Sequence, residues 1–132
     1  MIAPGVLEAI EKHARSVLPH ECCGLLVGTG TEIVEAISSP NLSDDPMRRF
    51  LLDPQTHFAA RRLARERGLA VVGFYHSHPN SEPVPSASDL AEATYPDHWY
   101  LIVRPLAARC DARLFRLEGS AFVEAALTSS SG

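Results

Sequence analysis

Two histidines and one aspartate form the group of side chains best suited to chemistry in this sequence, because all three can bind a metal ion. His76 and His78 follow residues 71–75, an apolar and β-prone run that predicts a buried strand. Side chains two residues apart leave the same face of a strand, so both imidazoles could reach one ion while Ser77 points away. Asp89 stands in a predicted helix start that would turn it back toward them. Two nitrogens and one carboxylate oxygen leave one tetrahedral position for water, which is typical of a catalytic zinc site.

Each of these features also has a plainer interpretation. A His-x-His pair at a strand end is commonly a surface feature without a bound metal. Ser86 followed three residues later by Asp89 is also the pattern of a capping box, which closes the first turn of a helix. Glu21 precedes the apolar run CCGLLVG and, on its residues alone, is interpreted as a solvated strand end, although from there its carboxylate could face a metal on a neighbouring strand. The residue types alone leave these alternatives open.

Taken together, these residues and their spacing resemble the signature of the JAMM (MPN+) metallopeptidases. In that signature a distant glutamate is followed by H-[ST]-H-x7-S-x-x-D, and this chain has H-E-C-C-G, then H-S-H, residues 79–85, and S-A-S-D. The resemblance implies one Zn²⁺ per chain, held by His76, His78 and Asp89. It also implies that Glu21 moves a proton from water to the leaving amine and that Ser86 donates to the oxyanion.

The same resemblance implies a substrate class. Deubiquitinating members of the family carry inserted segments that hold ubiquitin, whereas here only the short loop 80–85 lies between the histidines and Ser86. The compact form is similar to prokaryotic members that cleave ubiquitin-like sulfur-carrier proteins after a C-terminal Gly-Gly, which implies such a carrier as the partner. A deubiquitinase-like isopeptidase and a metal-binding scaffold without turnover are the alternatives. A zinc deaminase is set aside, because its signature needs H-x-E with P-C-x-x-C and the chain has no C-x-x-C.

Composition and charge restrict the remaining possibilities. The 132 residues with 45% hydrophobic content are typical of one globular domain, expected over residues 1–127 with a disordered tail at 128–132. The net charge of −4 provides no basic stripe for nucleic acid, and the arginines within 61–67 are interpreted as a solvated helix face. Three cysteines without C-x-x-C spacing predict no disulfide framework and indicate a reducing compartment. No apolar run approaches the ~18 residues of a membrane span and no signal-like segment is present, so a soluble cytoplasmic protein is expected.

Periodicity predicts the elements that must hold these residues in place. Helices are expected at 6–18, 54–67 and 86–93, and strands at 22–28, 31–38, 49–52, 71–75, 98–104, 111–117 and 121–127. His57, in the first turn of the second helix, is expected to be structural. Strands and helices interspersed without strict βαβ alternation predict an α+β fold, with a mixed sheet flanked by helices. The resemblance sharpens this to the curved sheet of the JAMM/MPN fold, which is similar to that of cytidine deaminases.

Overall fold

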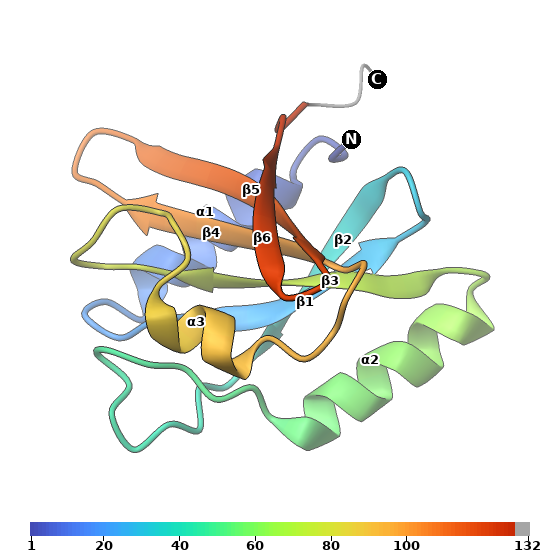
Figure 1. The fold of residues 1–132 in the computed structure, drawn as a ribbon, viewed down its shortest axis with the longest axis horizontal. Helices are drawn as coiled ribbons and strands as arrows, with labels where there is room; N and C mark the ends of the chain where they lie inside the picture. Colours follow the sequence, from blue (N-terminus) through green and yellow to red (C-terminus); the bar gives the residue numbers. More distant parts are fainter. Residues whose placement is uncertain (129–132) are drawn as a thin grey trace.

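One six-stranded sheet with helices on both faces forms the protein, as seen in a computed structural model that describes residues 1–128 (Figure 1). The elements in chain order are α1 (Val6–Ser16), β1 (Cys23–Gly28), β2 (Ile33–Ser39), α2 (Pro54–Glu66), β3 (Ala70–Ser77), α3 (Ala87–Glu92), β4 (Trp99–Pro105), β5 (Cys110–Glu118) and β6 (Ala121–Ala125). The strand order is β2-β1-β3-β4-β5-β6, and every neighbouring pair is antiparallel except β3 and β4, which are parallel. The predicted α+β fold with a mixed sheet is confirmed.

The central strand β3 carries alternate residues into two separate cores. Tyr75 packs on the face covered by α1, in a cluster with Ile10, whereas Phe74 packs on the face covered by α2, with Ala60. Because successive residues of a strand point to opposite faces, His76 shares the face of Phe74. The strand therefore delivers His76 to the side of the sheet on which α2 and α3 lie (Figure 1).

A close contact between β1 and β3 fixes this strand just before His76. The ring of Tyr75 lies over Gly24, where a Cβ atom would come within 2.3 Å of both the ring and the carbonyl oxygen of Ile37. Only glycine fits under the ring. The buried hydroxyl of Tyr75 has a hydrogen-bond partner in Nδ1 of His13, at 2.7 Å, so the contact leaves no unsatisfied polar group.

Two expected elements differ from the structure. The strand expected at 49–52 is wrong, because only an isolated bridge joins Asn41 and Leu52. The backbone N–H of Leu51 donates to the side-chain Oδ1 of Asn41 rather than to a strand carbonyl, so no ladder continues. The first helix ends at Ser16 and leaves Leu18 45% exposed, since a residue before proline avoids helical conformation.

Several expectations from composition concern the ends of the chain and its cysteines. All three cysteines are free, which confirms that there is no disulfide framework. Thr128, the first residue of the expected tail, accepts a 2.9 Å hydrogen bond from the backbone N–H of Ile2, and residues 129–132 of that tail lie outside the described residues. Within residues 1–128, the helices are all too short or too polar to span a membrane.

Candidate metal centre

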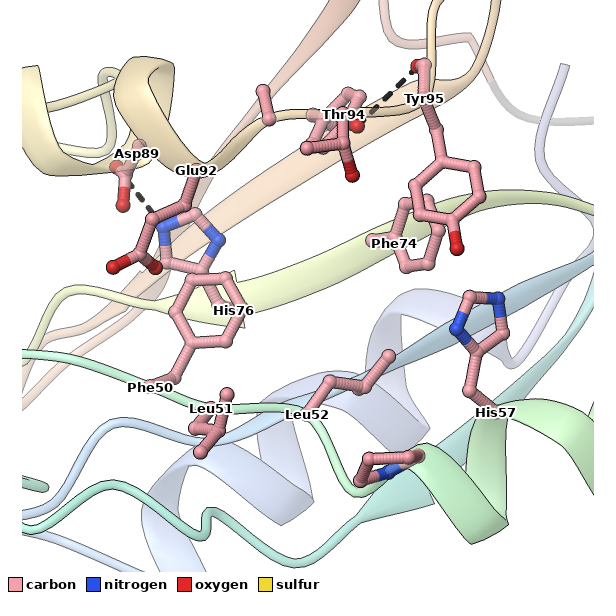
Figure 2. A pocket seen from close by; sticks show the side chains of 13 residues that line it. Phe50, Leu51, Leu52, His57, Phe74, His76, Asp89, Glu92, Thr94 and Tyr95 are labelled. Carbon is pink, nitrogen blue, oxygen red and sulfur yellow. Dashed lines mark hydrogen bonds and ion pairs between the residues drawn. The ribbon is translucent and has the colours of Figure 1, made fainter.

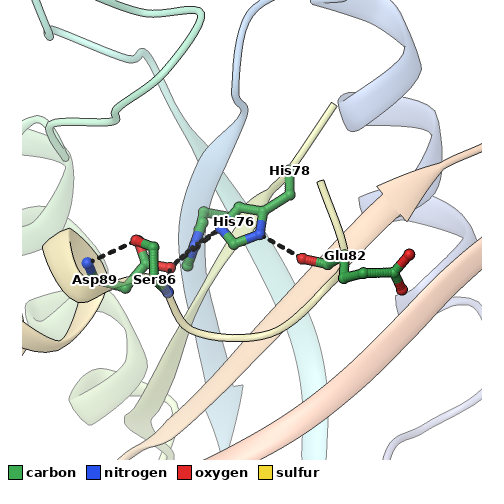
Figure 3. Close-up of polar contacts among 5 residues, drawn as sticks. All are labelled: His76, His78, Glu82, Ser86 and Asp89. Atoms are coloured by element: carbon green, nitrogen blue, oxygen red, sulfur yellow. Dashed lines mark hydrogen bonds and ion pairs between the residues drawn. The ribbon is translucent and has the colours of Figure 1, made fainter. Parts of the chain in front are cut away.

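The structure brings His76, His78 and Asp89 together at the end of β3 (Figure 3). The two histidine Nε2 atoms are 3.1 Å apart, and Oδ2 of Asp89 lies 3.2 Å from His76 Nε2 and 3.1 Å from His78 Nε2. Ligand atoms about 2.0 Å from a tetrahedral zinc ion are about 3.3 Å from one another. The three atoms form a nearly equilateral triangle of this size, so the donor set fits a zinc ion with one further position open.

The carboxylate of Asp89 takes part in the capping box of α3 and also belongs to the metal group. Ser86 is the N-cap of α3, its hydroxyl accepts the N–H of Asp89 at 3.0 Å, and its own N–H donates to Oδ2 of Asp89 at 2.9 Å. The capping box and the turn toward the histidines, posed as alternatives by the sequence, are therefore both present. Burial by itself would raise the pKa of Asp89, but its contacts with His76 and His78 and the hydrogen bond from the Ser86 N–H hold it well below its usual range. The carboxylate is ionised and ready to bind a cation.

The neighbours of the two imidazoles fix their orientation. Nδ1 of His78 donates to the carbonyl oxygen of Glu82 at 2.8 Å, which leaves the lone pair of Nε2 facing the group. Burial acts to lower the pKa of His78, but Asp89 and the Glu82 carbonyl raise it overall. The ring of Phe50 stacks on His76 with ring centroids 4.4 Å apart, and burial lowers the pKa of His76. His76 is thereby held neutral, in the form that binds a metal.

Glu21 is buried beside this group, not solvated at a strand end as its residue context suggested. The β1–β3 register pairs Cys23 with His76, so Glu21, two residues earlier, lies alongside His78. Its side chain is 6% exposed, and Oε1 has no hydrogen-bond partner among the described residues. Burial raises its pKa to about 7, with His78 opposing the shift and Asp89 adding to it. A carboxyl group with a free oxygen and a pKa near neutrality can both accept and donate a proton.

Ser86 presents a free hydroxyl proton at the rim of the group. Its Oγ accepts the N–H of Asp89, which orients the oxygen and leaves the O–H available to donate. The residue is exposed, so an incoming molecule can reach it. The arrangement is compatible with the oxyanion-donor role that the resemblance implies, and that role remains a prediction.

Cys22 and Cys23, next to Glu21, are poor candidates for chemistry. Both are buried, and burial raises the pKa of their thiols to about 12 and about 11, respectively. The thiolate is the reactive form, so these side chains behave as small core residues. Within the described part of the chain, His76, His78 and Asp89 are the one group of such side chains able to hold a metal.

Asn41 is a residue of the site that the sequence did not reveal. Its Nδ2 donates to the carbonyl oxygens of Glu21 and Arg49, and its Oδ1 accepts the N–H groups of Ser43 and Leu51, all at 3.0 Å. One side chain thus ties the backbone of Glu21 to the loop 42–51, which also supplies Phe50. Asparagine within a run of turn formers gives no sign of such a role, because its partners lie up to 20 positions away.

A pocket of about 480 Å³ opens directly beside the metal group (Figure 2). His76 and Asp89 stand at one end and His57 and Tyr95 at the other, as the labelled side chains in Figure 2 show. The walls between them are mainly apolar and come from the segment before α2, from β3 and from the segment after α3. The site can therefore hold an extended apolar chain that reaches the metal group at one end.

Known proteins are similar to this sequence over most of its length. Residues 3–118 match the profile of the prokaryotic homologs of the JAB domain. A desampylase of Haloferax volcanii is 36% identical over 110 residues, which cover 79% of each chain. A probable TtuB-protein conjugate cleaving protease of Thermus thermophilus is 33% identical over 69% of this chain and 61% of its own. A CysO-cysteine peptidase of Mycobacterium tuberculosis is 31% identical over 94% of this chain and 86% of its own.

Solved structures share the fold. A protein from Desulfitobacterium hafniense superposes with a TM-score of 0.84 at 29% identity, covering 100% of this chain and 94% of its own. A protein from Salinibacter ruber gives a TM-score of 0.75 at 34% identity, covering 98% and 92%. A JAB1/MPN domain protein from Archaeoglobus fulgidus gives 0.66 at 24% identity, covering 98% of both chains, and shows the fold alone.

Proposed function

The chain belongs to the prokaryotic homologs of the JAB domain, and on this premise we propose that it is a zinc-dependent isopeptidase. Its proposed substrate is a ubiquitin-like sulfur-carrier protein, cleaved at the bond that follows a C-terminal Gly-Gly. The observation that carries the proposal is the triangle of His76, His78 and Asp89 beside a buried Glu21 with a pKa of about 7. The names of the relatives support the substrate class, since they include desampylases, a TtuB-conjugate protease and a CysO-cysteine peptidase.

His76, His78 and Asp89 would hold the zinc ion. A zinc ion bound there supplies a Lewis acid that polarises a carbonyl group and lowers the pKa of water to ~7. Glu21 takes the proton of the attacking water and delivers it to the leaving amine, for which a carboxyl group with a pKa near neutrality is well matched. Ser86 donates its free O–H to the oxygen on which negative charge develops.

The surroundings of the metal group favour an extended chain with small residues at the scissile bond. Phe50 covers one face of His76 by stacking on it, and Asp89 of α3 contacts Nε2 of the same ring. Glycine has no side chain and lets the backbone approach such a site closely, so a Gly-Gly terminus suits the space. Larger residues further upstream can then occupy the apolar pocket.

A deubiquitinase-like isopeptidase is the second candidate. A histone deubiquitinase of Branchiostoma floridae is 31% identical over 71% of this chain, but the match covers 12% of that protein. The loop 79–85 between His78 and Ser86 is short and has no inserted segment that could hold a second ubiquitin. A scaffold role without turnover is disfavoured, because all the required side chains are present and converge.

Mass spectrometry of a substrate panel tests the proposal. The zinc-loaded protein is incubated with a carrier bearing a C-terminal extension, a carrier with an added cysteine, di-ubiquitin, and the same carriers with Gly-Gly changed to Ala-Ala. We expect cleavage after Gly-Gly in the carriers and slow or no cleavage of di-ubiquitin. Equal cleavage of the Ala-Ala forms would contradict the requirement for close backbone approach, and cleavage of di-ubiquitin alone would favour the second candidate.

A further inference from the structure

The end of the pocket remote from the metal group carries an organised polar cluster. His57 of α2 lies there against Phe74 and Tyr95, with ring centroids 5.3 and 5.4 Å away (Figure 2). Nε of Arg61, one turn further along α2, donates to Nε2 of His57 at 2.7 Å. The same guanidinium places Nη2 3.3 Å from Nε2 of His98. None of these side chains takes part in the chemistry proposed above.

These hydrogen bonds determine the tautomer of His57. Nε2 accepts a hydrogen from Arg61, so the proton of the neutral ring is on Nδ1. Burial and the nearby positive charge of Arg61 lower the pKa of His57, which keeps the ring neutral. Among residues 1–128, no acceptor lies within hydrogen-bond distance of Nδ1. The pocket wall therefore holds an N–H donor in a fixed orientation with no partner inside the described chain.

Arg61 holds this donor in place without a carboxylate of its own. The arginines that form ion pairs in the described part of the chain are Arg15, Arg67, Arg104, Arg109 and Arg113, and Arg61 is absent from that set. Its guanidinium instead lies 5.1 Å from the ring centroid of Tyr95, in a cation–π contact. This positive charge lies next to His57, so the remote end of the pocket favours an oxygen acceptor.

The position of Glu21 indicates which part of a substrate lies in the pocket. Along β3, Phe74 borders the pocket, His76 belongs to the metal group, and His78 is the neighbour of Glu21. Glu21 does not line the pocket, and the strand register places it beside His78, at the end of the metal group away from Phe74. The leaving amine takes its proton from Glu21, so the acyl part of the substrate extends the other way, into the pocket.

We propose that His57, oriented by Arg61, is a specificity-determining residue that donates its Nδ1–H to an oxygen of the substrate segment upstream of the scissile bond. An apolar side chain of the same segment fills the pocket between Phe50 and Tyr95. The proposal rests on the proposed isopeptidase function, because it takes the acyl tail of that reaction as the ligand. The acceptor is a backbone carbonyl oxygen or a side-chain carboxylate of the tail.

Fluorescence anisotropy with labelled peptides ending in Gly-Gly tests this without turnover. Zinc-loaded protein is titrated with a seven-residue peptide that reaches His57 and with a three-residue peptide that does not. His57→Ala is expected to lower the ratio of long-peptide to short-peptide affinity by about three- to tenfold, the effect of one hydrogen bond. Arg61→Met should give a similar fall, and the double variant should fall no further, because the two residues act as one unit. Arg62→Met, on the exposed face of the same helix, is the matched control.

Upstream substitutions in the long peptide identify the acceptor. If an aspartate there makes binding more dependent on His57 than a leucine does, a carboxylate is the acceptor; equal dependence indicates the backbone carbonyl. An unchanged affinity ratio in His57→Ala, or additive losses in the double variant, would overturn the role of this pair while leaving the proposed function intact. Wild-type protein that binds none of the Gly-Gly peptides would overturn both proposals.

Discussion

The side-chain amide of Asn41 donates a 3.0 Å hydrogen bond to the backbone carbonyl of Glu21, 20 positions away in the sequence. The backbone N–H of Glu21 donates to the carbonyl of Pro46 at 2.8 Å, so the loop that Asn41 fastens holds Glu21 from both sides. The buried carboxyl group needs this support, because its Oε1 has no hydrogen-bond partner among the described residues. The loop and the backbone of Glu21, whose carboxyl group carries the proton, are therefore held in place together.

Replacing Asn41 with aspartate should therefore impair the reaction without emptying the metal site. The new carboxylate would keep the two accepted hydrogen bonds but lose both donors and would place a negative charge against two carbonyl oxygens. We expect a loss of about 1–3 kcal/mol in the free energy of unfolding, from urea titrations, and a fall in kcat at unchanged zinc content. Asn80→Asp adds the same charge on an exposed loop near His78 and is the control. Equal effects of the two substitutions would show that charge alone is responsible.

Glu21→Gln should separate proton transfer from metal binding. Glutamine has nearly the same shape but cannot carry the proton, so turnover should fall by about 10²- to 10⁴-fold. Zinc content, measured by metal analysis, should remain at about one per chain, because Glu21 lies outside the triangle of ligand atoms. Loss of zinc in this variant would identify Glu21 as a ligand and contradict the role given to it here.

The raised pKa of Glu21 predicts how metal-free protein responds to pH. Its folded pKa of about 7 lies above the ordinary value of 4.5, so the folded state binds more protons than the unfolded state between these pH values. Stability attributable to Glu21 is therefore fully present below about pH 4.5 and is lost as pH rises to about 7. In chelator-treated protein, wild type should become less stable relative to Glu21→Gln by roughly 1–3 kcal/mol between pH 5 and pH 7.5. A change in the opposite direction would mean that the ionised carboxylate is stabilised, with His78 the dominant neighbour.

His78→Ala should abolish stoichiometric zinc binding. The substitution removes one corner of the ligand triangle and leaves Asp89 facing a single imidazole. Metal analysis after reconstitution should give much less than one zinc per chain, with the fold retained by circular dichroism. His20→Ala, in an exposed loop, should keep full zinc content. Full zinc content in His78→Ala would rule out the assigned ligand set.

Gly24→Ala should weaken both the fold and the site. The added methyl group would overlap the ring of Tyr75, one residue before His76, and the carbonyl oxygen of Ile37. Overpacking of this kind costs about 1–3 kcal/mol, and the displaced strand should also bind zinc less tightly. Thermal denaturation and zinc titration measure the two effects. Gly30→Ala, where an added Cβ meets nothing within 4 Å, is the matched control, and equal melting temperatures would show that the contact with Tyr75 tolerates a side chain.

The sequence by itself determined the elements and the spacing of the metal group. The apolar run before His76 and the Ser86 capping pattern are local signals. The first depends on the pattern of apolar residues and the second on hydrogen bonds within one helical turn, so both can be recognised without the tertiary structure. Two elements are exceptions: the first helix ends earlier than expected, and at 49–52 the side chain of Asn41 takes the place of a strand partner. Side-chain acceptors of this kind leave no periodic signal.

Only the tertiary structure decided the environment of Glu21 and the extent of the pocket. A carboxylate before an apolar run is solvated unless another strand buries it, and β3 does so because the sheet places it next to β1 across some fifty positions of sequence. The resemblance to a family anticipated the importance of Glu21, but its raised pKa depends on burial that no local pattern encodes. The same holds for His57, expected to be structural, whose free Nδ1–H follows from a hydrogen bond with Arg61 and from the segments that enclose the pocket. Burial and long-range contact set the protonation state and orientation of a side chain, and both are properties of the folded chain rather than of its order of residues.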